Sequence, residues 1–330
     1  MATTGLSKRS RSSSSASRSK TPQLPKDLLT IADIPRKTIQ GLLTLAKKLK
    51  ASHGKSRQSF PLKGKTLGLI FEKPSTRTRV SFEVGMNQLG GQALFLASEK
   101  IQLSRGESLA DTAKVLSRYL DGLVIRTFDQ SALEEWARHT SIPVINGLTD
   151  HCHPCQALAD LLTIVEKKGR AKGLKLAYIG DGNNITHSLL EIGAKMGMHI
   201  SVGCPPGYEP DPTIVKQAKA EGAQTGATIE ITHDPMVAAK DADAIYTDVW
   251  ISMGQEDEHE PRMTAFAPYQ VNSELMKQAK SRAIVLHCLP AHRGEEITAD
   301  VLDGPQSVVL DQAENRLHIQ KAILIEWLGK

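Results

Sequence analysis

Residues 66–79 read TLGLIFEKPSTRTR and predict a strand that turns directly into a helix. The apolar run Thr66–Phe71 is typical of a buried strand, and Pro74 ends it because proline cannot donate a hydrogen bond to a sheet. Beyond Ser75, apolar residues recur at helical spacing until Gly90. The polar residues between these two patterns therefore lie at the N-terminus of a helix.

This strand–helix junction has the chemistry of an anion site. A helix N-terminus leaves backbone N–H groups unpaired and carries partial positive charge. Ser75, Thr76 and Thr78 add hydroxyl groups, while Arg77 and Arg79 add guanidinium groups, which match phosphate oxygens. We interpret the junction as a phosphate-binding site. The alternative is a capping serine followed by solvated arginines on an exposed helical turn.

Strand and helix patterns alternate along most of the chain. Strands are expected at residues 66–71, 92–96, 123–126 and 142–145, and then at 174–179, 199–203, 228–231, 244–247, 283–286 and 307–310. This alternation predicts an α/β protein with two doubly wound parallel-sheet domains. We place these domains at residues 28–153 and 154–311, and expect a C-terminal helix in 312–330 to pack back on the first domain.

The start of the first domain carries a helix signal. Asp33 is a plausible N-cap, Pro35 is compatible with the first helical turn, and a run of apolar residues at helical spacing follows. Gly54 comes after the last turn, as is common where a helix ends. We therefore expect a helix that begins just after Asp33.

Composition excludes several classes of function. The 330 residues carry a net charge of +5, but residues 1–26 hold six basic residues and no acidic one, which leaves 35 basic and 36 acidic residues in the remainder. The body of the chain thus lacks the basic surface of a nucleic-acid-binding protein. No apolar run approaches the roughly 20 residues needed to span a membrane. Four cysteines in a chain of this length indicate a reducing compartment.

Residues 1–27 are expected to form a basic, disordered tail. Enrichment in arginine and serine without acidic residues is typical of an organelle transit peptide, which predicts a mitochondrial matrix protein. The tail lacks a clear apolar helical face, so a plain solvated tail and a cytoplasmic location are the alternative.

Polar side chains gather where the predicted parallel strands end, which is where such sheets bind ligands. Residues 151–155 read HCHPC and contain zinc-type ligands and a CxxC pair. No second pair of cysteine or histidine residues lies at a suitable spacing, so neither a metal site nor a redox site is favoured. We expect His153 to donate to a substrate oxygen, with Gln156 beside it; a helix-capping histidine is the alternative.

Three further strand ends are candidates. Residues 178–184 read YIGDGNN, which lacks the third glycine of a dinucleotide-binding loop and indicates amide contacts to a small ligand or a tight turn. Asp248 begins a polar loop and has the charge to hold an ammonium group. Cys288 follows another strand and is compatible with a nucleophile, a buried structural cysteine or a polarisable contact to a substrate amine.

Taken together, these motifs resemble those of the carbamoyltransferases. The motifs are STRTR at residues 75–79, HPCQ at 153–156, Asp248 with SMG at 252–254, and HCLP at 287–290. The first two are similar to motifs of the whole superfamily, and the last two to those of its ornithine-specific members. The similarity runs from about Leu28 to the C-terminus, and the tail lies outside it.

The resemblance implies a reaction and a set of site residues. The carbamoyl group of carbamoyl phosphate would pass to the side-chain amine of L-ornithine, giving citrulline and phosphate in arginine biosynthesis, without a metal or cofactor. Carbamoyl phosphate would be bound by Ser75, Thr76, Arg77, Thr78, Gln102, Arg126, His153, Gln156 and Arg316, and ornithine by Asn184, Asp248, Ser252, Met253, Cys288 and Leu289. Arg77, Arg126, His153, Asp248 and Cys288 would be catalytic. Gln102 would complete the site of a neighbouring subunit in a homotrimer.

Other functions make different predictions. A carbamoyltransferase for putrescine or an acylated ornithine would differ only in the amine it accepts. A dehydrogenase built on residues 178–184 would bind NAD. An interaction protein would depend on the basic tail and not on the residues at the strand ends.

Overall fold

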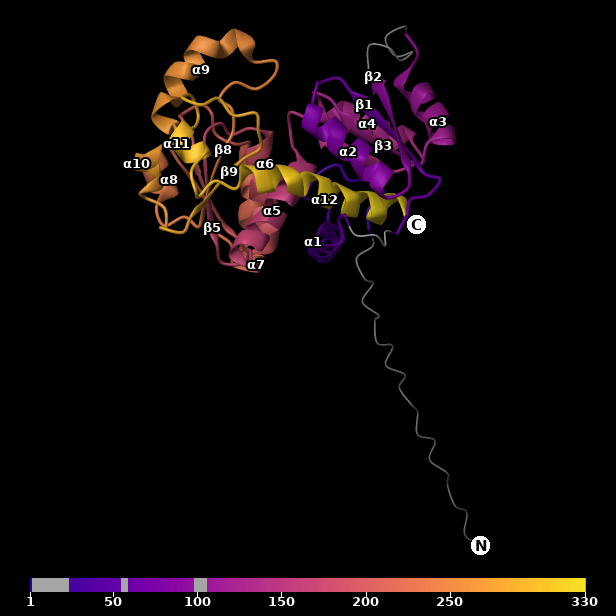
Figure 1. The fold of residues 1–330 in the computed structure, drawn as a ribbon, viewed down its shortest axis with the longest axis horizontal. Helices are drawn as coiled ribbons and strands as arrows, with labels where there is room; N and C mark the ends of the chain where they lie inside the picture. The colour runs from indigo at the N-terminus through magenta and orange to yellow at the C-terminus, as the bar shows by residue number, and fades with distance from the viewer. Residues whose placement is uncertain (2–23, 55–58, 98–105, 330) are drawn as a thin grey trace.

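The computed structural model describes Met1 and residues 24–54, 59–97 and 106–329. These residues form two parallel sheets with helices packed on them, and the two lobes lie side by side (Figure 1). The predicted fold class, two parallel-sheet α/β domains, is confirmed. Within the described ranges, no helix has the length and apolarity needed to cross a membrane.

The first sheet contains four parallel strands in the order β2-β1-β3-β4. They are β1 (Thr66–Phe71), β2 (Gln92–Ala97), β3 (Gly122–Arg126) and β4 (Val144–Leu148), with α2 (Thr76–Gln88), α3 (Leu109–Tyr119) and α4 (Gln130–His139) between them. Phe71 at the end of β1 pairs with Arg126 at the end of β3. The turn that follows Phe71 and the side chain of Arg126 are thus brought to the same edge of the sheet.

The second sheet contains five parallel strands in the order β7-β6-β5-β8-β9. They are β5 (Lys175–Ile179), β6 (His199–Gly203), β7 (Ile229–Thr232), β8 (Ala244–Thr247) and β9 (Ile284–His287). The helices of this lobe are α6 (Asn184–Met196), α7 (Pro212–Thr225), α8 (Pro235–Ala239), α9 (His259–Phe266), α10 (Ser273–Met276) and α11 (Ala299–Leu302). Strand order reverses between β5 and β8, which is the usual place for a ligand site in such a sheet.

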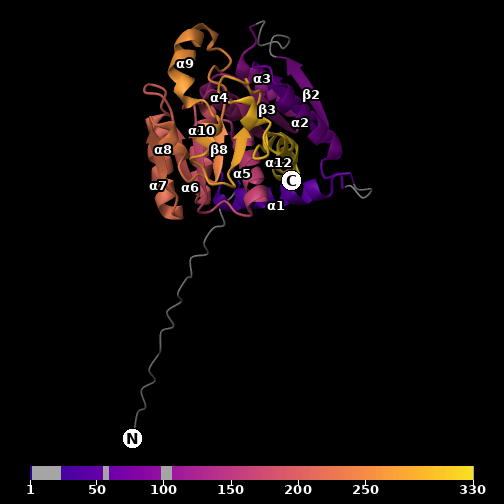
Figure 2. The same ribbon diagram turned by 60° about the vertical axis from the view of Figure 1, so that its left-hand side comes forward.

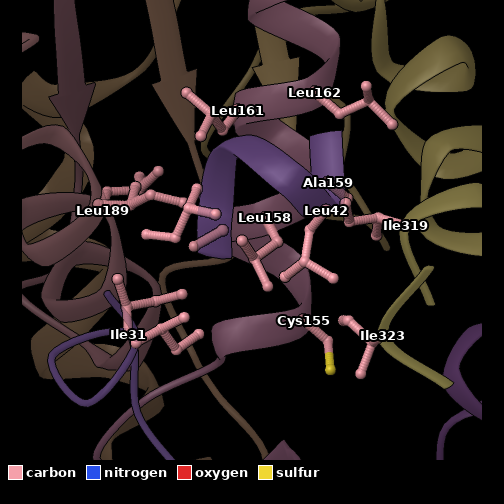
Figure 3. Close-up of a cluster of buried hydrophobic side chains, with 14 of the residues drawn as sticks. Ile31, Leu42, Cys155, Leu158, Ala159, Leu161, Leu162, Leu189, Ile319 and Ile323 are labelled. Atoms are coloured by element: carbon pink, nitrogen blue, oxygen red, sulfur yellow. The ribbon is translucent and has the colours of Figure 1, made fainter. Parts of the chain in front are cut away.

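Three helices join the lobes: α1 (Arg36–Ala51), α5 (Pro154–Lys168) and α12 (Val309–Leu328). Helix α12 packs on α1, α2 and α5, and crosses from one lobe to the other (Figures 1 and 2). Leu158 of α5, Leu42 of α1 and Ile319 of α12 meet in one buried apolar cluster (Figure 3). Both α5 and α12 are buried on several sides, and the buried residues of α12 include polar ones such as Gln312 and Arg316.

Two predictions about element boundaries are wrong. Residues 307–310 do not form a strand, because only Ser307 makes a β-bridge, to Val285, and α12 already begins at Val309. An apolar run this short fits a strand or a buried helix equally well. At the other end of the chain, Pro35 and not Asp33 occupies the N-cap position of α1. Asp33 instead accepts a hydrogen bond from the Thr30 hydroxyl in the preceding turn.

Candidate active site

A cleft of about 1230 Å³ lies between the two lobes at the carboxyl ends of their strands. The predicted residues that line it are Ser75, Thr76, Arg77, Thr78, Arg126, His153, Gln156 and Arg316, together with Asn184, Asp248, Ser252, Met253, Cys288 and Leu289. The structure therefore brings together the predicted residues of both lobes. Gln102 lies outside the described residues, so its predicted role stays a prediction.

One wall of the cleft is the N-terminus of α2. Ser75 has an extended backbone, with φ of −161°, and its Oγ accepts the backbone N–H of Thr78 at 3.2 Å. This is N-cap geometry, so the capping serine of the alternative interpretation is present at the predicted anion site. The hydroxyl of Thr78 in turn accepts Nη2 of Arg316 at 3.0 Å. The first turn of α2 is thus fixed at the cleft by its own cap and by a guanidinium from the last helix.

Three arginines line the same part of the cleft. Arg316 is buried and donates Nη1 to Gln156 Oε1 at 2.7 Å. Arg77 donates to the carbonyl oxygen of Leu289, which belongs to the other lobe. The pKa of Arg126 is lowered to about 10 by burial and then by the charges of Arg316 and Arg77. Such mutual repulsion is relieved by a bound anion, so this cluster is suited to phosphate.

His153 lies next to the arginines, at the N-terminus of α5. Its backbone N–H donates to Ser188 Oγ at 2.8 Å, whereas its buried Nδ1 has no partner among the described residues. Burial, followed by the charges of Arg316, Arg126 and Arg77, lowers the pKa of this imidazole well below 6.5. His153 is therefore a neutral ring, able to donate one hydrogen bond to a polar ligand atom.

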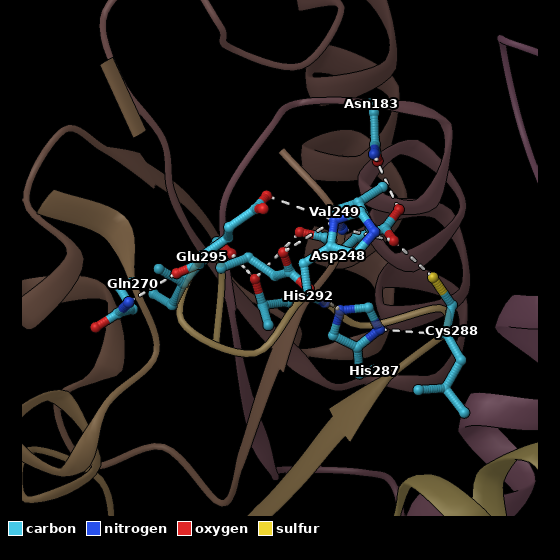
Figure 4. Close-up of polar contacts among 12 residues, drawn as sticks. Asn183, Asp248, Val249, Gln270, His287, Cys288, His292 and Glu295 are labelled. Atoms are coloured by element: carbon cyan, nitrogen blue, oxygen red, sulfur yellow. Dashed lines mark hydrogen bonds and ion pairs between the residues drawn. The ribbon is translucent and has the colours of Figure 1, made fainter. Parts of the chain in front are cut away.

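The opposite wall carries a carboxylate and a thiol. Asp248 follows β8, and its Oδ2 accepts Asn183 Nδ2 at 3.2 Å. Its Oδ1 accepts the backbone N–H of Val249 at 2.9 Å and the thiol of Cys288 at 2.8 Å (Figure 4). Burial and then the charge of Asp248 raise the pKa of Cys288 well above 9. Cys288 is therefore a thiol and not a reactive thiolate at neutral pH, which disfavours the nucleophile interpretation.

Residues 252–254 form part of the cleft rim between β8 and α9. The backbone N–H of Ser252 donates to Gln255 Oε1 at 3.1 Å, and this contact closes a tight turn. The side chain of Met253 is exposed. A thioether at the rim offers a flexible apolar surface to a ligand side chain.

Some residues of the cleft were missed by sequence reasoning. Asn183, rather than its neighbour Asn184, contacts Asp248, while the Asn184 amide donates to the carbonyl of Thr149 at 2.6 Å. Arg262 is buried in α9 and pairs with Asp181 at 2.9 Å. The two adjacent asparagines in the sequence indicated that an amide contact lies here, but not which of the two residues makes it. Arg262 also pairs with Glu258 one helical turn earlier, at 2.8 Å, but that spacing is common on exposed helices and did not indicate the buried pair with Asp181, 81 positions away.

The structure also locates the possible ligands for a metal ion. Within the described ranges, two trios bring such atoms within 4.8 Å of one another: Asp248, His287 and Cys288, and His292, Glu295 and Glu296. Neither trio includes residues 151–155. His287 already uses both ring nitrogens, one accepting the Leu289 N–H at 2.8 Å and the other contacting Glu296 at 3.1 Å. Its ring therefore offers no free ligand atom.

The two parallel-sheet domains face an arginine-rich cleft with a carboxylate–thiol pair opposite, an arrangement suited to binding an anionic and a cationic group side by side. The aspartate/ornithine carbamoyltransferase carbamoyl-P binding domain matches residues 26–166, and the Asp/Orn binding domain of the same family matches residues 172–327. Together these matches cover most of the chain, and the protein belongs to the aspartate/ornithine carbamoyltransferase family.

Individual relatives agree with this assignment. The chain is 59% identical over 303 residues to an ornithine carbamoyltransferase of Anoxybacillus flavithermus, and 55% identical over 304 residues to that of Thermococcus kodakarensis. Each match covers 92% of this chain and 96% of the relative. The solved structure of the Pyrococcus furiosus ornithine carbamoyltransferase superposes with a TM-score of 0.89 at 54% identity, covering 92% of this chain and 97% of that one.

These relatives overturn the predicted mitochondrial location. They come from one bacterium and two archaea, whose cells have no mitochondria. The family match begins at residue 26, so it leaves out the basic tail on which the prediction relied. That prediction rested on the composition of the tail, whose sequence lacks a clear apolar helical pattern. Most of the tail predicted to be disordered, residues 2–23, lies outside the described residues. The predicted end of the tail at residue 27 is wrong, because Leu24 packs on the core and Lys26 donates to the carbonyls of Ala137 and Thr140 at 2.6 and 2.8 Å.

Proposed function

We propose that this protein transfers the carbamoyl group of carbamoyl phosphate to the side-chain amine of L-ornithine, producing L-citrulline and phosphate. One observation carries the proposal: three arginines and the α2 N-terminus on one side of the cleft face the Asp248–Cys288 pair on the other, with His153 also in the cleft. This arrangement offers an anion site, a carbonyl site and an ammonium site to two substrates. Relatives named ornithine carbamoyltransferase support the choice of amine.

The phosphate of carbamoyl phosphate would bind at the start of α2. Ser75, Thr76, Arg77 and Thr78 supply hydroxyl, guanidinium and backbone N–H donors there, since the first turn of a helix leaves N–H groups unpaired. Arg126 would bridge phosphate and carbonyl oxygens, and its Nε, which has no hydrogen-bond partner among the described residues, supports this role. The leaving group is thus held by fixed positive charge.

The carbamoyl group would lie between His153 and Gln156. The neutral imidazole is suited to donating to the carbonyl oxygen, which gains negative charge when the amine attacks. Arg316 binds both Gln156 and Thr78, and therefore orients the carbonyl and phosphate subsites with one guanidinium. Fixed donors at these positions stabilise the tetrahedral intermediate without reorganising during the reaction.

Ornithine would occupy the second lobe. Asp248 would hold an ammonium group, Cys288 and Leu289 would lie beside the reacting amine, and Ser252 and Met253 would contact the substrate from the rim. Asn184 would line the same subsite, although its amide nitrogen is already bonded to Thr149. The attacking nitrogen must lose a proton first, and Asp248 and Cys288 would hold the amine and influence that step. The departing phosphate is a candidate for the final proton acceptor.

A homotrimer and a role in arginine biosynthesis belong to the same proposal. The exposed apolar residues Val80 and Val84 of α2 and Leu94 of the edge strand β2 are a suitable contact for another subunit. In such an assembly Gln102 would reach the site of a neighbour. Sedimentation equilibrium tests this assembly, with an expected mass three times that of the 35.9 kDa chain.

Citrulline formation from ornithine and carbamoyl phosphate tests the proposed reaction. Putrescine and N-acetylornithine are the comparison amines in the same assay. We expect the highest kcat/KM with L-ornithine, because the second lobe supplies polar contacts for an amino acid as well as for an amine. Turnover of another amine with no turnover of ornithine would refute the proposed substrate.

A further inference from the structure

Behind the cleft, a buried hydrogen bond joins a polar residue of α5 to one of α12. The roles proposed for the site residues do not explain why this bridge is there. Its two central residues, Asp160 and Gln312, are 0% and 1% exposed and do not line the cleft. Gln312 Nε2 donates to Asp160 Oδ1 at 2.7 Å. A carboxylate in such a position is costly unless hydrogen bonds satisfy it, so its presence requires an explanation.

The Asp160 end of this bridge holds the carbonyl subsite. Asp160 Oδ1 also accepts Gln156 Nε2 at 2.8 Å, and Gln156 Oε1 accepts Arg316 Nη1 at 2.7 Å. The amide of Gln156 is therefore held in one orientation, since its nitrogen faces an acceptor and its oxygen faces a donor. Without Asp160, that orientation would depend on Arg316 alone.

The Gln312 end holds the amine subsite. Gln312 Oε1 accepts the backbone N–H of His287 at 2.9 Å, one residue before Cys288. Its Nε2 also lies 3.2 Å from the hydroxyl of Tyr246, near the end of β8. One glutamine thus ties the ends of β8 and β9 to α12, which is the helix that carries Arg316 into the phosphate site.

Resting on the proposed function, we infer that Asp160 and Gln312 are positioning residues that couple the two substrate subsites. The path runs from Arg316 through Gln156, Asp160 and Gln312 to the backbone of His287. A ligand that orders Gln156 and Arg316 also orders the turn that holds Cys288, and the reverse must hold equally. The bridge therefore makes each substrate bind more tightly in the presence of the other.

The coupling is measured as a ratio of dissociation constants. The probe is L-norvaline, which is ornithine without its side-chain amine and so accepts no carbamoyl group. Calorimetric titration of the whole protein with norvaline, with and without saturating carbamoyl phosphate, gives the coupling factor. Typical factors between coupled sites are about 5- to 150-fold. We expect the coupling factor of the unmodified protein to lie in this range and that of Gln312→Ala to fall below about twofold. The affinity of Gln312→Ala for carbamoyl phosphate alone should be reduced far less.

Asn315→Ala is the matched control. Asn315 lies on α12 three positions after Gln312 and makes the same kind of contact to α5, donating to Thr163 Oγ1 at 3.0 Å. Its other partners, Glu166 and Lys50, do not line the cleft, so it belongs to no path between the two subsites. We expect this variant to lose stability while keeping the coupling factor. Gln312→Met, which keeps the volume without hydrogen bonds, replaces Gln312→Ala if the alanine variant does not fold.

Three results would overturn the inference. The first is a Gln312 variant whose coupling factor equals that of the unmodified protein. The second is an Asn315→Ala variant whose coupling factor falls as far as that of Gln312→Ala. The third is an unmodified protein that binds both ligands with a coupling factor of about one. An unmodified protein that binds carbamoyl phosphate but forms no citrulline from ornithine would instead refute the proposed function.

Discussion

Thr78 accepts a hydrogen bond from Arg316 at 3.0 Å, and the two residues are 238 positions apart in the chain. Helix α12 therefore places a charged group of the C-terminal segment at the N-terminus of α2. The guanidinium is buried, with Thr78, Gln156 and Gln320 as its partners. The phosphate-side wall of the cleft is consequently complete only when α12 is packed against α2.

Replacing Arg77 by alanine is expected to remove phosphate binding without unfolding the protein. Its side chain donates a hydrogen bond to the carbonyl oxygen of Leu289 and is half-buried at the cleft. A charge-assisted hydrogen bond contributes about 1.5–3 kcal/mol, so affinity for inorganic phosphate and carbamoyl phosphate should fall at least tenfold. Calorimetric titration measures the affinity, and thermal unfolding checks the fold.

Arg79→Ala is the control for this substitution. Arg79 belongs to the same helical turn but is exposed, pairs with Glu83 at 2.9 Å and does not line the cleft. We expect its loss to leave phosphate affinity within about twofold, because exposed ion pairs contribute little. A folded Arg77→Ala protein that binds phosphate as tightly as Arg79→Ala does would contradict the assignment of the phosphate site.

The Cys288 thiol is expected to resist alkylation at neutral pH although it faces the cleft. Only the thiolate reacts with iodoacetamide, and burial together with Asp248 raises the pKa of this thiol well above 9. The rate at pH 7.5 should be lower than that of free cysteine. Asp248→Asn removes the neighbouring charge and should increase the rate. Mass spectrometry locates the modified cysteine, and rapid labelling of Cys288 at pH 7.5 would show that the thiolate is present.

His153 should remain neutral through the pH range in which histidines usually titrate. Its pKa is lowered well below 6.5 by burial and by the three arginines, so no protonation is expected between pH 8 and pH 6. Nitrogen-15 NMR of the imidazole, assigned with a His153→Gln variant, should show unchanged shifts over this range. Kinetically, His153→Ala should lower kcat about 100- to 1000-fold, as loss of an oxyanion donor does. An imidazolium signal near pH 6.5 would refute the neutral-donor role.

The sequence predicts the parts of the site that depend on local patterns. The strand–turn–helix at residues 66–79 is found as expected, because an apolar run, a proline and a capping serine act within one segment. The choice between Asn183 and Asn184 could not be predicted, since it depends on where α6 begins. The Asp160–Gln312 bridge joins residues 152 positions apart and arises only when α5 and α12 pack together. Buried polar contacts between distant helices leave no periodic signal.

We expect the buried carboxyl of Glu191, in α6, to make the free energy of unfolding depend on pH. The backbone N–H groups of Ala32 and Ile31 lower the pKa of its carboxyl, and its Oε2 has no partner among the described residues. Burial is the main reason that its pKa is raised from 4.5 to about 7. Because the folded state holds this proton more tightly than the unfolded chain does, stability is highest below pH 4.5 and falls as the pH rises toward 7.

Glu191→Gln isolates this effect, because glutamine keeps an acceptor for the backbone and carries no charge. The free energy of unfolding of the variant, relative to the unmodified protein, should rise between pH 4.5 and pH 7 and level off above pH 7. Its gain is at most about 3 kcal/mol, given about 1.4 kcal/mol for each pKa unit. Urea unfolding at pH 5, 6, 7 and 8 measures it. Glu134→Gln, at an exposed position of α4, should show no such rise. A constant difference across this range would mean that Glu191 is charged in the folded protein and that the backbone N–H groups outweigh its burial.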